Sequence, residues 1–358
     1  MITTTTWRHN LTNYSNLDNV NESGQQQLQI FQPLASNKIR FQLSNLYDEV
    51  PLKINAFTIK TDASLTTSIT LDNMSEFEVP ARLSVWSDWI DFDLSEKTFL
   101  TINIASSNTK VHTAGLTISN DLIKTRQTDA AEPKYFFGIS AIQIQTENTF
   151  QRLAFFGDSL TNQGNFSAPL AIDLESNFKI MTANFGISGN RILHPGHSTS
   201  PWSNSFGEAG LTRFDHMLVD YQPNVVIFME GINDLLHPGT GAPLIELPTA
   251  TAIIQAIYQL RKKAHDLGIT FIPMTITPAN GNMNDEIPGW NNQKEDLRLT
   301  INHAIRQLPH CIDLSDLVSN GSYLKTDFDC GDHVHFSKNG GKIVADYVKE
   351  QLIRQKII

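Results

Sequence analysis

The sequence is poor in the residues and patterns that mark several common classes of protein. Cysteine occurs only twice in 358 residues, as Cys311 and Cys330, and neither lies in a Cys-x-x-Cys pair or in a Cys/His spacing typical of zinc sites. The two could form one disulfide, but two free thiols in a reducing compartment is the interpretation that we favour. No stretch approaches the roughly 18 consecutive apolar residues that a membrane-spanning helix needs, so no transmembrane segment is predicted.

Positive charge is also scarce. Lys and Arg total 27 against 37 Asp and Glu, which gives a formal net charge of -10, and no run rich in Lys or Arg occurs. A protein that binds phosphate backbones needs a basic face, so we expect no nucleic-acid partner, and the acidity offers no attraction to anionic membranes. The first residues, MITTTTWRHNLTNYSN, lack the basic and then apolar segments of a signal peptide. We therefore expect a cytoplasmic protein without a membrane partner.

Two patterns of hydrophobicity divide the chain. Between about residues 25 and 150, short runs rich in Ile, Val, Thr and Phe alternate between apolar and polar residues, and turn-forming residues separate them. Examples are KIRFQLSN (38–45), TFLTINIAS (98–106) and FFGISAIQIQT (136–146). Such runs with short connections are typical of antiparallel strands. We predict an all-β sandwich domain, jelly-roll-like, over residues 1–150.

After residue 150, apolar runs of strand length alternate with longer amphipathic segments. The runs are RLAFFGDS (152–159), KIMTANFG (179–186), NVVIFMEG (224–231), TFIPMTIT (270–277) and HCIDLSDL (310–317). The clearest helix is predicted over 249–267, where apolar residues recur at helical spacing and Gly268 stands at the stop position. Five strands separated by helices predict a parallel, doubly wound sheet in a flavodoxin-like three-layer α/β domain over 151–358. Ligands of such domains bind beyond the carboxyl ends of the strands.

Two glycine-containing motifs follow the first two of these runs. In FFGDSL (155–160) the apolar strand gives way to Ser159, whose hydroxyl would be exposed at a strand-to-helix turn, near backbone donors at the start of a helix. Taken alone, this serine could be a helix N-cap instead. In NFGISGNRIL (184–193), Gly186 and Gly189 flank a tight turn and would let a backbone N–H approach a ligand, although a plain turn also explains this motif.

Two further motifs carry polar side chains that catalysis could use. In MEGINDLL, the Asn233 amide follows a strand and could donate to a developing oxyanion, whereas Asp234 is assigned to loop structure. In DCGDHVHFSKNGG, Asp332 and His335 are three residues apart, so the carboxylate can reach the imidazole Nδ1–H and leave Nε2 to accept a serine proton. His333 is out of phase with this pair and is interpreted as structural.

Taken together, the order Ser, Gly, Asn, Asp-x-x-His resembles the four-block pattern of the SGNH (GDSL) hydrolases. The blocks here are GDSL with Ser159, GISGN with Gly189, GIND with Asn233, and DHVH with Asp332 and His335. The resemblance covers about residues 150–355 and is to a bacterial branch of GDSL-like lipases and esterases in which a β-rich region precedes the hydrolase domain; residues 40–59 are similar to that region. The family usually has proline where this chain has Phe336, which we expect to alter loop stiffness and not chemistry. The GxSxG elbow of α/β-hydrolases is absent around Ser159.

The resemblance implies a carboxylic ester hydrolase with Ser159 as nucleophile, His335 as acid and base, and Asp332 as the partner of His335. The oxyanion would be held by the backbone N–H groups of Ser159 and Gly189 and by the Asn233 side chain, and no cofactor or metal is implied. Short-acyl esters are the expected substrates, with acylated carbohydrates among them. Candidate substrate contacts, each of which could as well be an ordinary loop residue, are Asp158, Arg191, His194, His197, Trp202, His237 and Trp290.

Three alternatives stay open at this point. An acyltransferase would use the same triad with an alcohol in place of water. A metal-dependent phosphoesterase could surround metal ions with Asp158, Asn233, Asp234, His333 and His335, although no early Asp-x-His motif completes a two-metal site. A third interpretation makes the N-terminal sandwich a carbohydrate-binding module beside a degenerate scaffold, whereas we favour a structural role for the sandwich. The oligomeric state is not predicted.

Overall fold

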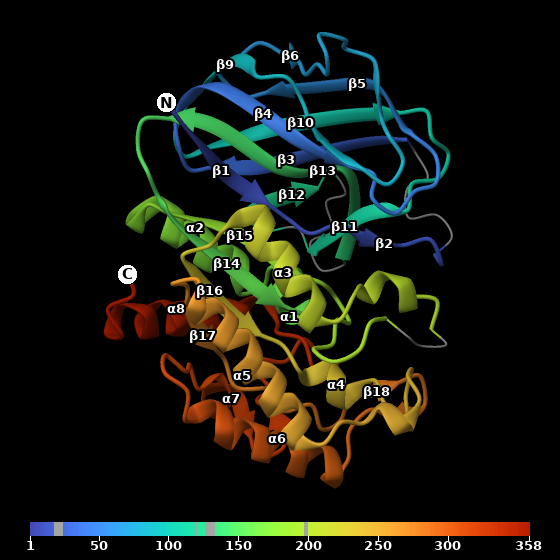
Figure 1. The fold of residues 1–358 in the computed structure, drawn as a ribbon, viewed down its shortest axis with the longest axis vertical. Coiled ribbons are helices and arrows are strands. Elements are labelled where there is room, and N and C mark those ends of the chain that lie inside the picture. Colours follow the sequence, from blue (N-terminus) through green and yellow to red (C-terminus); the bar gives the residue numbers. More distant parts are fainter. Residues whose placement is uncertain (18–23, 119, 126–132, 197–199) are drawn as a thin grey trace. The chain divides into compact units, whose positions relative to one another are not determined.

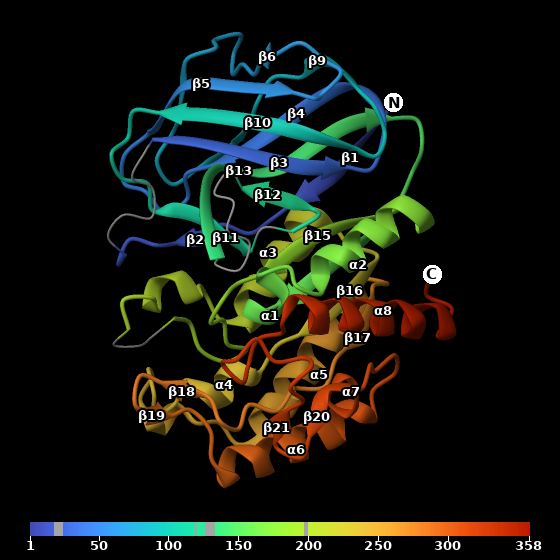
Figure 2. The same ribbon diagram turned by 180° about the vertical axis from the view of Figure 1, so that it is seen from behind.

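The computed structural model describes residues 1–17, 24–118, 120–125, 133–196 and 200–358. These residues divide into two compact units. The first consists of Met1–Gln151 and Ala171–Ala183, and the second of Arg152–Leu170 and Asn184–Ile358. Strands dominate the N-terminal part of the chain, whereas strands and helices alternate after residue 150 (Figures 1 and 2).

Two antiparallel sheets make up the N-terminal part of the chain. The first has the strand order β2-β11-β13-β4-β8, with β1 paired to β13 and β9 paired to β4. The second has the order β12-β3-β10-β5-β6, with β7 paired to β5. In chain order the strands are β1 (Ile2–Arg8), β2 (Thr12–Asn13), β3 (Gln25–Gln32), β4 (Ser36–Ser44), β5 (Leu52–Lys60), β6 (Thr67–Ser68), β7 (Phe77–Val79), β8 (Ser84–Trp86), β9 (Ile90–Leu94), β10 (Thr98–Ser106), β11 (Thr113–Ile118), β12 (Ile123–Thr125) and β13 (Pro133–Thr146). The prediction of an antiparallel β region is confirmed.

Strand β4 shows why these runs form strands around a shared core. Ile39, Phe41 and Leu43 are fully buried, and the residues between them are only partly buried, so one face of the strand points inward. The Phe41 ring lies 5.0 Å from the ring of Phe57 on β5, centroid to centroid. Because β4 and β5 belong to different sheets, this contact and the continuous cluster of buried apolar residues join the two sheets through one core.

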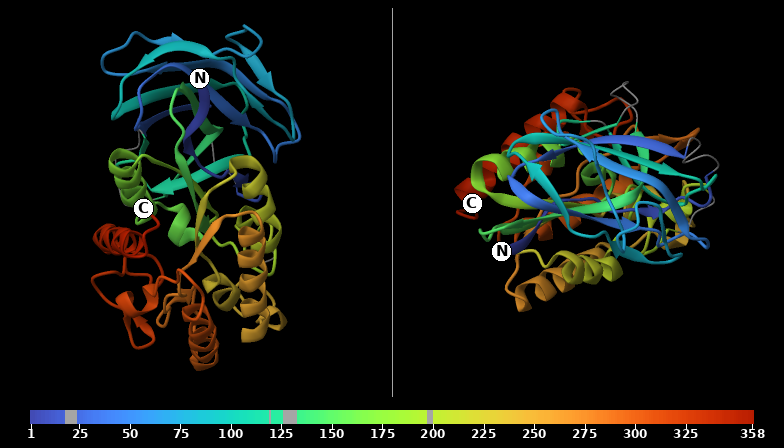
Figure 3. Two further views of the ribbon diagram at one scale, coloured as in Figure 1. Left: turned by 60° about the vertical axis from the view of Figure 1, so that its left-hand side comes forward. Right: turned by 90° about the horizontal axis from the view of Figure 1, so that it is seen from above.

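A parallel sheet follows after residue 150. Its strand order is β15-β14-β16-β17, where β14 spans Gln151–Gly157, β15 Ile180–Gly186, β16 Val225–Met229 and β17 Thr270–Pro273. The pairs β14–β16 and β16–β17 are parallel, and every residue of β16 is buried. Continuous apolar runs suit such strands because helices cover both faces of a parallel sheet. In Figure 3, α3 and α5 lie on one face of this sheet and α8 on the other.

The helices begin and end where local signals place them. The best-defined one, α5, spans Ala250–Asp266 and confirms the prediction over 249–267, with the Thr249 side chain accepting from Ala252 N as its N-cap. The other α-helices are α1 (Ser159–Asn162), α2 (Ser167–Asp173), α3 (Gly210–Tyr221), α4 (Ile232–Leu236), α6 (Asn292–Arg306), α7 (Leu314–Val318) and α8 (Lys338–Arg354). Short hairpins pair β18 (Met283–Asn284) with β19 (Ile287–Pro288) and β20 (Ser319–Asn320) with β21 (Tyr323–Leu324). Over the described residues, no helix combines the length and the apolar character needed to cross a membrane.

The prediction of a fifth strand over 310–317 is wrong for most of that range. Ile312 forms only an isolated parallel bridge with Met274. The next residue, Asp313, accepts from Asp316 N as the N-cap of α7, and its carboxylate also pairs with Arg306. An aspartate that caps a helix ends the extended conformation at that point, so the apolar pattern continues as a helix and not as a strand.

Glu175 is a buried carboxyl group whose ionisation destabilises the fold. It lies in a π-helical turn (Leu174–Phe178). Oε1 accepts from the N–H and the hydroxyl of Thr182, at 3.1 and 2.7 Å, and Oε2 has no hydrogen-bond partner among the described residues. Burial raises the pKa of Glu175 from 4.5 to about 8. Because the folded state holds this proton more tightly than the unfolded state, its contribution to stability is present below pH 4.5 and is lost as the pH rises towards about 8.

Glu175→Gln is therefore expected to raise the melting temperature at pH 9 and to have little effect at pH 5. The gain at pH 9 should correspond to roughly 2–5 kcal/mol, since a neutral amide escapes the cost of a buried charge. Thermal unfolding followed by circular dichroism at both pH values measures it. Glu350→Gln, at an exposed position of α8, serves as the control and should show no gain at either pH. A gain for Glu175→Gln of equal size at both pH values would contradict this explanation.

Candidate active site

Ser159 lies at the carboxyl end of β14, where α1 begins. The Asp158 side chain accepts a hydrogen bond of 3.0 Å from Leu160 N and so caps this helix. Gly157 before it cannot carry a side chain, because a Cβ would lie 2.3 Å from the Met229 backbone oxygen. The sequence GDS thus fixes the serine at the edge of the sheet: glycine allows two strand ends to approach closely, and aspartate starts the helix.

His335 joins Ser159 to Asp332. Its Nε2 lies 2.7 Å from Ser159 Oγ, and its Nδ1 lies 2.5 Å from Asp332 Oδ2. The other carboxylate oxygen of Asp332 accepts from the backbone N–H groups of Val334 and His335, at 2.9 and 2.8 Å. Partial burial opposes ionisation of Asp332, but the hydrogen bond and charge of His335 and the two backbone donors hold its pKa well below the usual range. The imidazole Nε2 is thus placed to accept the proton of the serine hydroxyl, while the Asp332 carboxylate orients the ring.

A second carboxylate–imidazole pair stands on the same loop. Asp329 Oδ2 lies 2.7 Å from His333 Nδ1, and Oδ1 of the same carboxylate accepts from the N–H groups of Gly331 and His333. Asn282 donates to the backbone oxygen of Asp332 from a different loop. The Asp329 carboxylate therefore ties the loop to itself, and the sequence interpretation of His333 as structural agrees with this placement. Nothing in the sequence pattern had marked Asp329 or Asn282.

Phe336 anchors the loop directly after His335. It is one of the largest fully buried side chains, and its backbone oxygen accepts a hydrogen bond of 2.8 Å from Asn165 Nδ2. The N–H of the following residue, Ser337, donates to the Phe328 backbone oxygen, and the Ser337 side chain caps α8. The loop is thus held here by burial and by hydrogen bonds.

Gly189 lies in the loop that follows β15, and Asn233 lies in the first turn of α4, the helix that follows β16. Gly189 has φ +76°, and a Cβ at this position would lie 2.1 Å from a ring atom of Phe206, so only glycine fits. Asn233, near the start of α4, donates from Nδ2 to the Asn190 backbone oxygen at 3.0 Å. The next side chain, Asp234, accepts from the N–H groups of Ile192 and Leu193. These hydrogen bonds join the segment after β15 to the start of α4. Asp234 holds the backbone of the loop, as expected from the sequence.

Three of the candidate substrate contacts are buried and have internal partners. Asp158, Arg191 and Trp290 are only 1%, 2% and 4% exposed. Arg191 pairs with Glu246 at 2.7 Å and donates to a backbone oxygen, and Trp290 Nε1 donates to Glu295. Burial also raises the pKa of Asp158 well above its ordinary value. These side chains have partners inside the protein that support the loops, and a role for them in substrate contact stays a prediction.

The remaining candidates are more accessible. Trp202 is 41% exposed, and His194 and His237 are partly buried. The His237 ring lies 4.8 Å from the Phe206 ring, the same ring that closes over Gly189. Burial, reinforced by the charges of Arg191 and Lys294, lowers the pKa of His237 to about 3, so this imidazole is neutral near pH 7. His197 lies outside the described residues.

The residues that a metal-dependent phosphoesterase would need are engaged elsewhere. The carboxylates of Asp158 and Asp234 accept backbone N–H groups, and His335 Nε2 faces Ser159. Within the described residues, the single group of potential metal ligands that lie within 4.8 Å of one another is Asp329, Cys330 and Asp332. Both carboxylates of this group already hold an imidazole, and Cys330, like Cys311, is a free thiol.

Comparison with known proteins finds one family model that matches more than half of the chain. The model of the GDSL-like Lipase/Acylhydrolase family matches residues 155–343, which include Ser159, Gly189, Asn233, Asp332 and His335. No curated protein sequence matches the chain.

Solved structures similar to this chain include several esterases and lipases. A GDSL-like lipase from Bacteroides thetaiotaomicron is 17% identical over 57% of this chain and 88% of that one, with a TM-score of 0.42. The psychrotrophic esterase EstA from Pseudoalteromonas sp. is 18% identical over 58% and 100%, with a TM-score of 0.41. An acetyl xylan esterase, AlAXEase, is 21% identical over 56% and 98%, with a TM-score of 0.39.

Proposed function

Since the chain belongs to the GDSL-like lipase/acylhydrolase family, we propose that it is a serine esterase that hydrolyses carboxylic esters. The observation that carries this proposal is the position of His335, 2.7 Å from the Ser159 hydroxyl and 2.5 Å from the Asp332 carboxylate. A serine hydroxyl is a weak nucleophile unless a base removes its proton, and an imidazole held by a carboxylate is such a base. Ser159, His335 and Asp332 are the proposed catalytic residues.

The proposed reaction has two steps. Ser159 Oγ attacks the ester carbonyl while His335 Nε2 takes the hydroxyl proton, and His335 then gives this proton to the departing alcohol. Water, activated by the same imidazole, hydrolyses the acyl-enzyme and restores the serine. Asp332 holds the ring with Nδ1–H towards the carboxylate and stabilises the imidazolium that forms in each step. These side chains complete the cycle without a cofactor or metal.

The proposed oxyanion hole combines backbone and side-chain donors. The N–H of Ser159 lies at the start of α1, and Gly189 N–H lies in a turn that excludes any side chain. The amide of Asn233 has two N–H groups, one of which donates to Asn190 O, and the other can meet the negative oxygen of the tetrahedral intermediate. Donors fixed in advance stabilise charge that develops in the transition state without reorganisation.

We further propose that residues 151–358 form the catalytic domain and residues 1–150 an accessory domain. The strand order β15-β14-β16-β17 supports a flavodoxin-like arrangement, because the first strand lies between the second and the third. The two antiparallel sheets with a shared core support a β-sandwich of jelly-roll type for the accessory domain. The accessory domain is proposed to be structural.

The decisive test combines a substrate panel with active-site labelling. The purified protein is assayed on p-nitrophenyl esters of increasing acyl length and on acetylated sugars, and we expect short-acyl esters to be hydrolysed fastest. A serine-directed phosphonate should abolish hydrolysis and add its mass to the peptide that contains Ser159, whereas a chelator should leave hydrolysis unchanged. Product analysis with added alcohols distinguishes a transferase, which would form new esters. Loss of activity with the chelator but not with the phosphonate would refute the proposal.

Asn233→Ala is expected to lower kcat by about 10²–10³-fold, because it removes one oxyanion donor. Steady-state kinetics on a short p-nitrophenyl ester measures the effect, and KM should change much less than kcat. Asn224→Ala is the matched control, because Asn224 is exposed and precedes the amino end of the same strand, β16. A kinetically silent Asn233→Ala would show that the oxyanion is held by other groups.

A further inference from the structure

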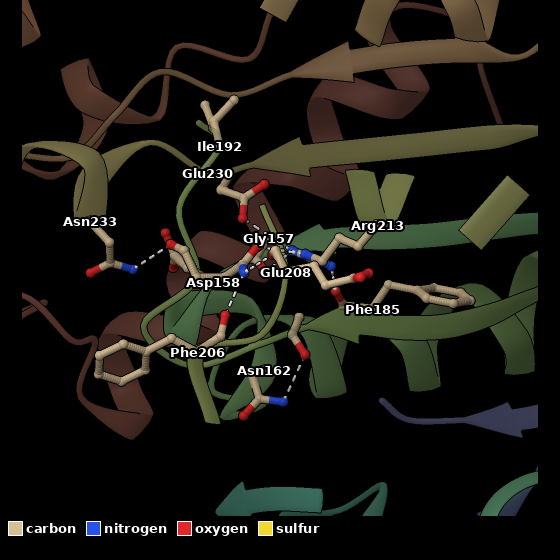
Figure 4. A network of polar contacts seen from close by, with 12 residues as sticks. Gly157, Asp158, Asn162, Phe185, Ile192, Phe206, Glu208, Arg213, Glu230 and Asn233 are labelled. Carbon is tan, nitrogen blue, oxygen red and sulfur yellow. Dashed lines mark hydrogen bonds and ion pairs between the residues drawn. The ribbon is translucent and has the colours of Figure 1, made fainter. Parts of the chain in front are cut away.

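Arg213, a buried arginine on α3, binds the ends of several segments that meet at the active site. Its guanidinium lies 3.8 Å above the centroid of the Phe156 ring. It donates to backbone and side-chain acceptors, which are Gly157 O at 2.7 Å, Phe185 O at 2.5 Å, Asn190 Oδ1 at 2.5 Å and Glu230 Oε1 at 3.1 Å. Figure 4 shows Gly157, Phe185 and Glu230 meeting the guanidinium from separate segments of the chain. None of the four motif blocks that contain the proposed catalytic groups includes this residue.

The first of these acceptors lies just before the nucleophile. Gly157 O belongs to the last residue of β14, two residues before Ser159, and also accepts a hydrogen bond of 3.0 Å from Ile187 N. Arg213 therefore fixes the peptide from which Ser159 and its N–H follow. It also links this strand end to the turn that contains Gly189, because Ile187 lies two residues before that glycine.

Asn190 connects the arginine to the other proposed donors. Its side-chain oxygen accepts from Arg213, while its Nδ2 donates to the backbone oxygens of Phe206 and Glu208. Its backbone oxygen accepts from Asn233 Nδ2 at 3.0 Å. Asn190 directly follows Gly189, so one residue bound by Arg213 sets the position of both Gly189 and Asn233.

We propose that Arg213 is a positioning residue that holds the three oxyanion donors, Ser159 N–H, Gly189 N–H and Asn233 Nδ2, in register with one another. This inference rests on the proposed function. The guanidinium is suited to the task because its donors point in fixed directions within one plane, whereas a lysine ammonium is a compact charge on a flexible stem. The Glu230 carboxylate, fully buried beside the guanidinium, balances the charge of Arg213. Burying this ion pair therefore costs less free energy than burying an isolated cation would.

Arg213→Lys tests the proposal because it keeps the positive charge next to Glu230 and removes the planar set of donors. We expect kcat to fall about 10- to 100-fold with KM within about threefold, since small displacements of catalytic donors have effects of this size. The matched control is Arg298→Lys. Arg298 is equally buried and donates to Ile276 O, Ser315 Oγ and Glu295, none of which is a proposed catalytic group. The kcat of Arg298→Lys should stay within about threefold of the wild type at a loss of melting temperature comparable to that of Arg213→Lys.

A double-mutant cycle with Asn233→Ala separates positioning from general weakening of the fold. If Arg213 acts by holding the oxyanion donors, the double variant should lose at least about fivefold less activity than the product of the two single losses. The affinity of a phenylboronic acid, which forms an anionic tetrahedral adduct on a catalytic serine, should fall in Arg213→Lys by the same factor as kcat/KM. Multiplicative losses, or an unchanged boronic acid affinity, would overturn the proposal.

A second variant covers the case in which Arg213→Lys does not fold. The pair Arg213→Met with Glu230→Gln removes both charges together, so no uncompensated buried charge remains. It should show the same fall in kcat and in boronic acid affinity, and wild-type kinetics in this pair would refute the role of Arg213. A wild type without phosphonate-sensitive hydrolysis would refute the proposed function. An active wild type with an unaffected Arg213 variant would refute only the positioning role.

Discussion

Ser159→Ala is expected to lower kcat for ester hydrolysis by about 10⁴-fold or more. Without the hydroxyl, no acyl-enzyme can form, and only water positioned by the remaining groups can attack the ester. His335, whose Nε2 now faces the Ser159 oxygen at 2.7 Å, would lose the group from which it takes a proton. KM should change little, because the serine contributes mainly to the transition state. Initial rates on p-nitrophenyl acetate, at enzyme concentrations high enough to detect the residual activity, measure the effect.

Ser167→Ala is the matched control for this variant. Ser167 is also buried, at the start of α2, and its hydroxyl donates to the Thr161 backbone oxygen at 2.7 Å. It has the same chemistry as Ser159 but a backbone partner instead of an imidazole, so its loss should reduce stability slightly and leave kcat within about threefold. A Ser159→Ala enzyme with wild-type kcat would mean that another group is the nucleophile.

The residues brought together around Ser159 were predictable because each lies within a short local motif. Gly157, Asp158 and Ser159 form one strand-to-helix turn, and Asp332 and His335 are close enough in sequence to contact each other wherever their loop goes. The strands of the parallel sheet were likewise visible as apolar runs, since both faces of such strands are buried. The sequence could assign these elements because local pattern and final environment agree.

The groups that support the site could not be found in the same way. Arg213 is separated by 56 residues from Gly157 and by 23 from Asn190, and an arginine in an amphipathic helix is normally an exposed residue. Trp290 and Arg191 show the same limit: both side chains are buried, and a loop position does not reveal whether a side chain points outward or into the interior. Burial of polar groups depends on partners that are distant in sequence.

In the C-terminal loop, too, the sequence alone does not show which side chains contact each other, and here an experiment can test the answer. Two carboxylate–imidazole pairs stand side by side in the sequence DCGDHVH, Asp329 with His333 at 2.7 Å and Asp332 with His335 at 2.5 Å. Spacing alone allows either pair to serve a serine. Of these two imidazoles, the structure brings His335 to the nucleophile: its Nε2 contacts Ser159 Oγ, while His333 packs beside Gly281.

Asp332→Asn is therefore expected to lower kcat by about 10³–10⁴-fold at nearly unchanged KM. An amide in this position favours the wrong tautomer of His335, so Nε2 would carry a hydrogen and could no longer accept the proton of Ser159. The two backbone N–H groups that now bind Asp332 Oδ1 can still bind the amide oxygen, which keeps the loop folded. Kinetics on a short p-nitrophenyl ester, together with the melting temperature, separate loss of chemistry from loss of structure.

Asp329→Asn makes the same chemical change three residues earlier and is the control. Asp329 holds the loop through Gly331 and His333 and has no bond to His335 among the described contacts, so we expect less than about a tenfold loss of kcat with a lower melting temperature. Phosphonate labelling of Ser159 should fall with Asp332→Asn and persist with Asp329→Asn, because only the former changes the base that activates the serine. The opposite order of effects would assign catalysis to the Asp329–His333 pair, and that assignment would require the loop to move so that His333 replaces His335 at Ser159.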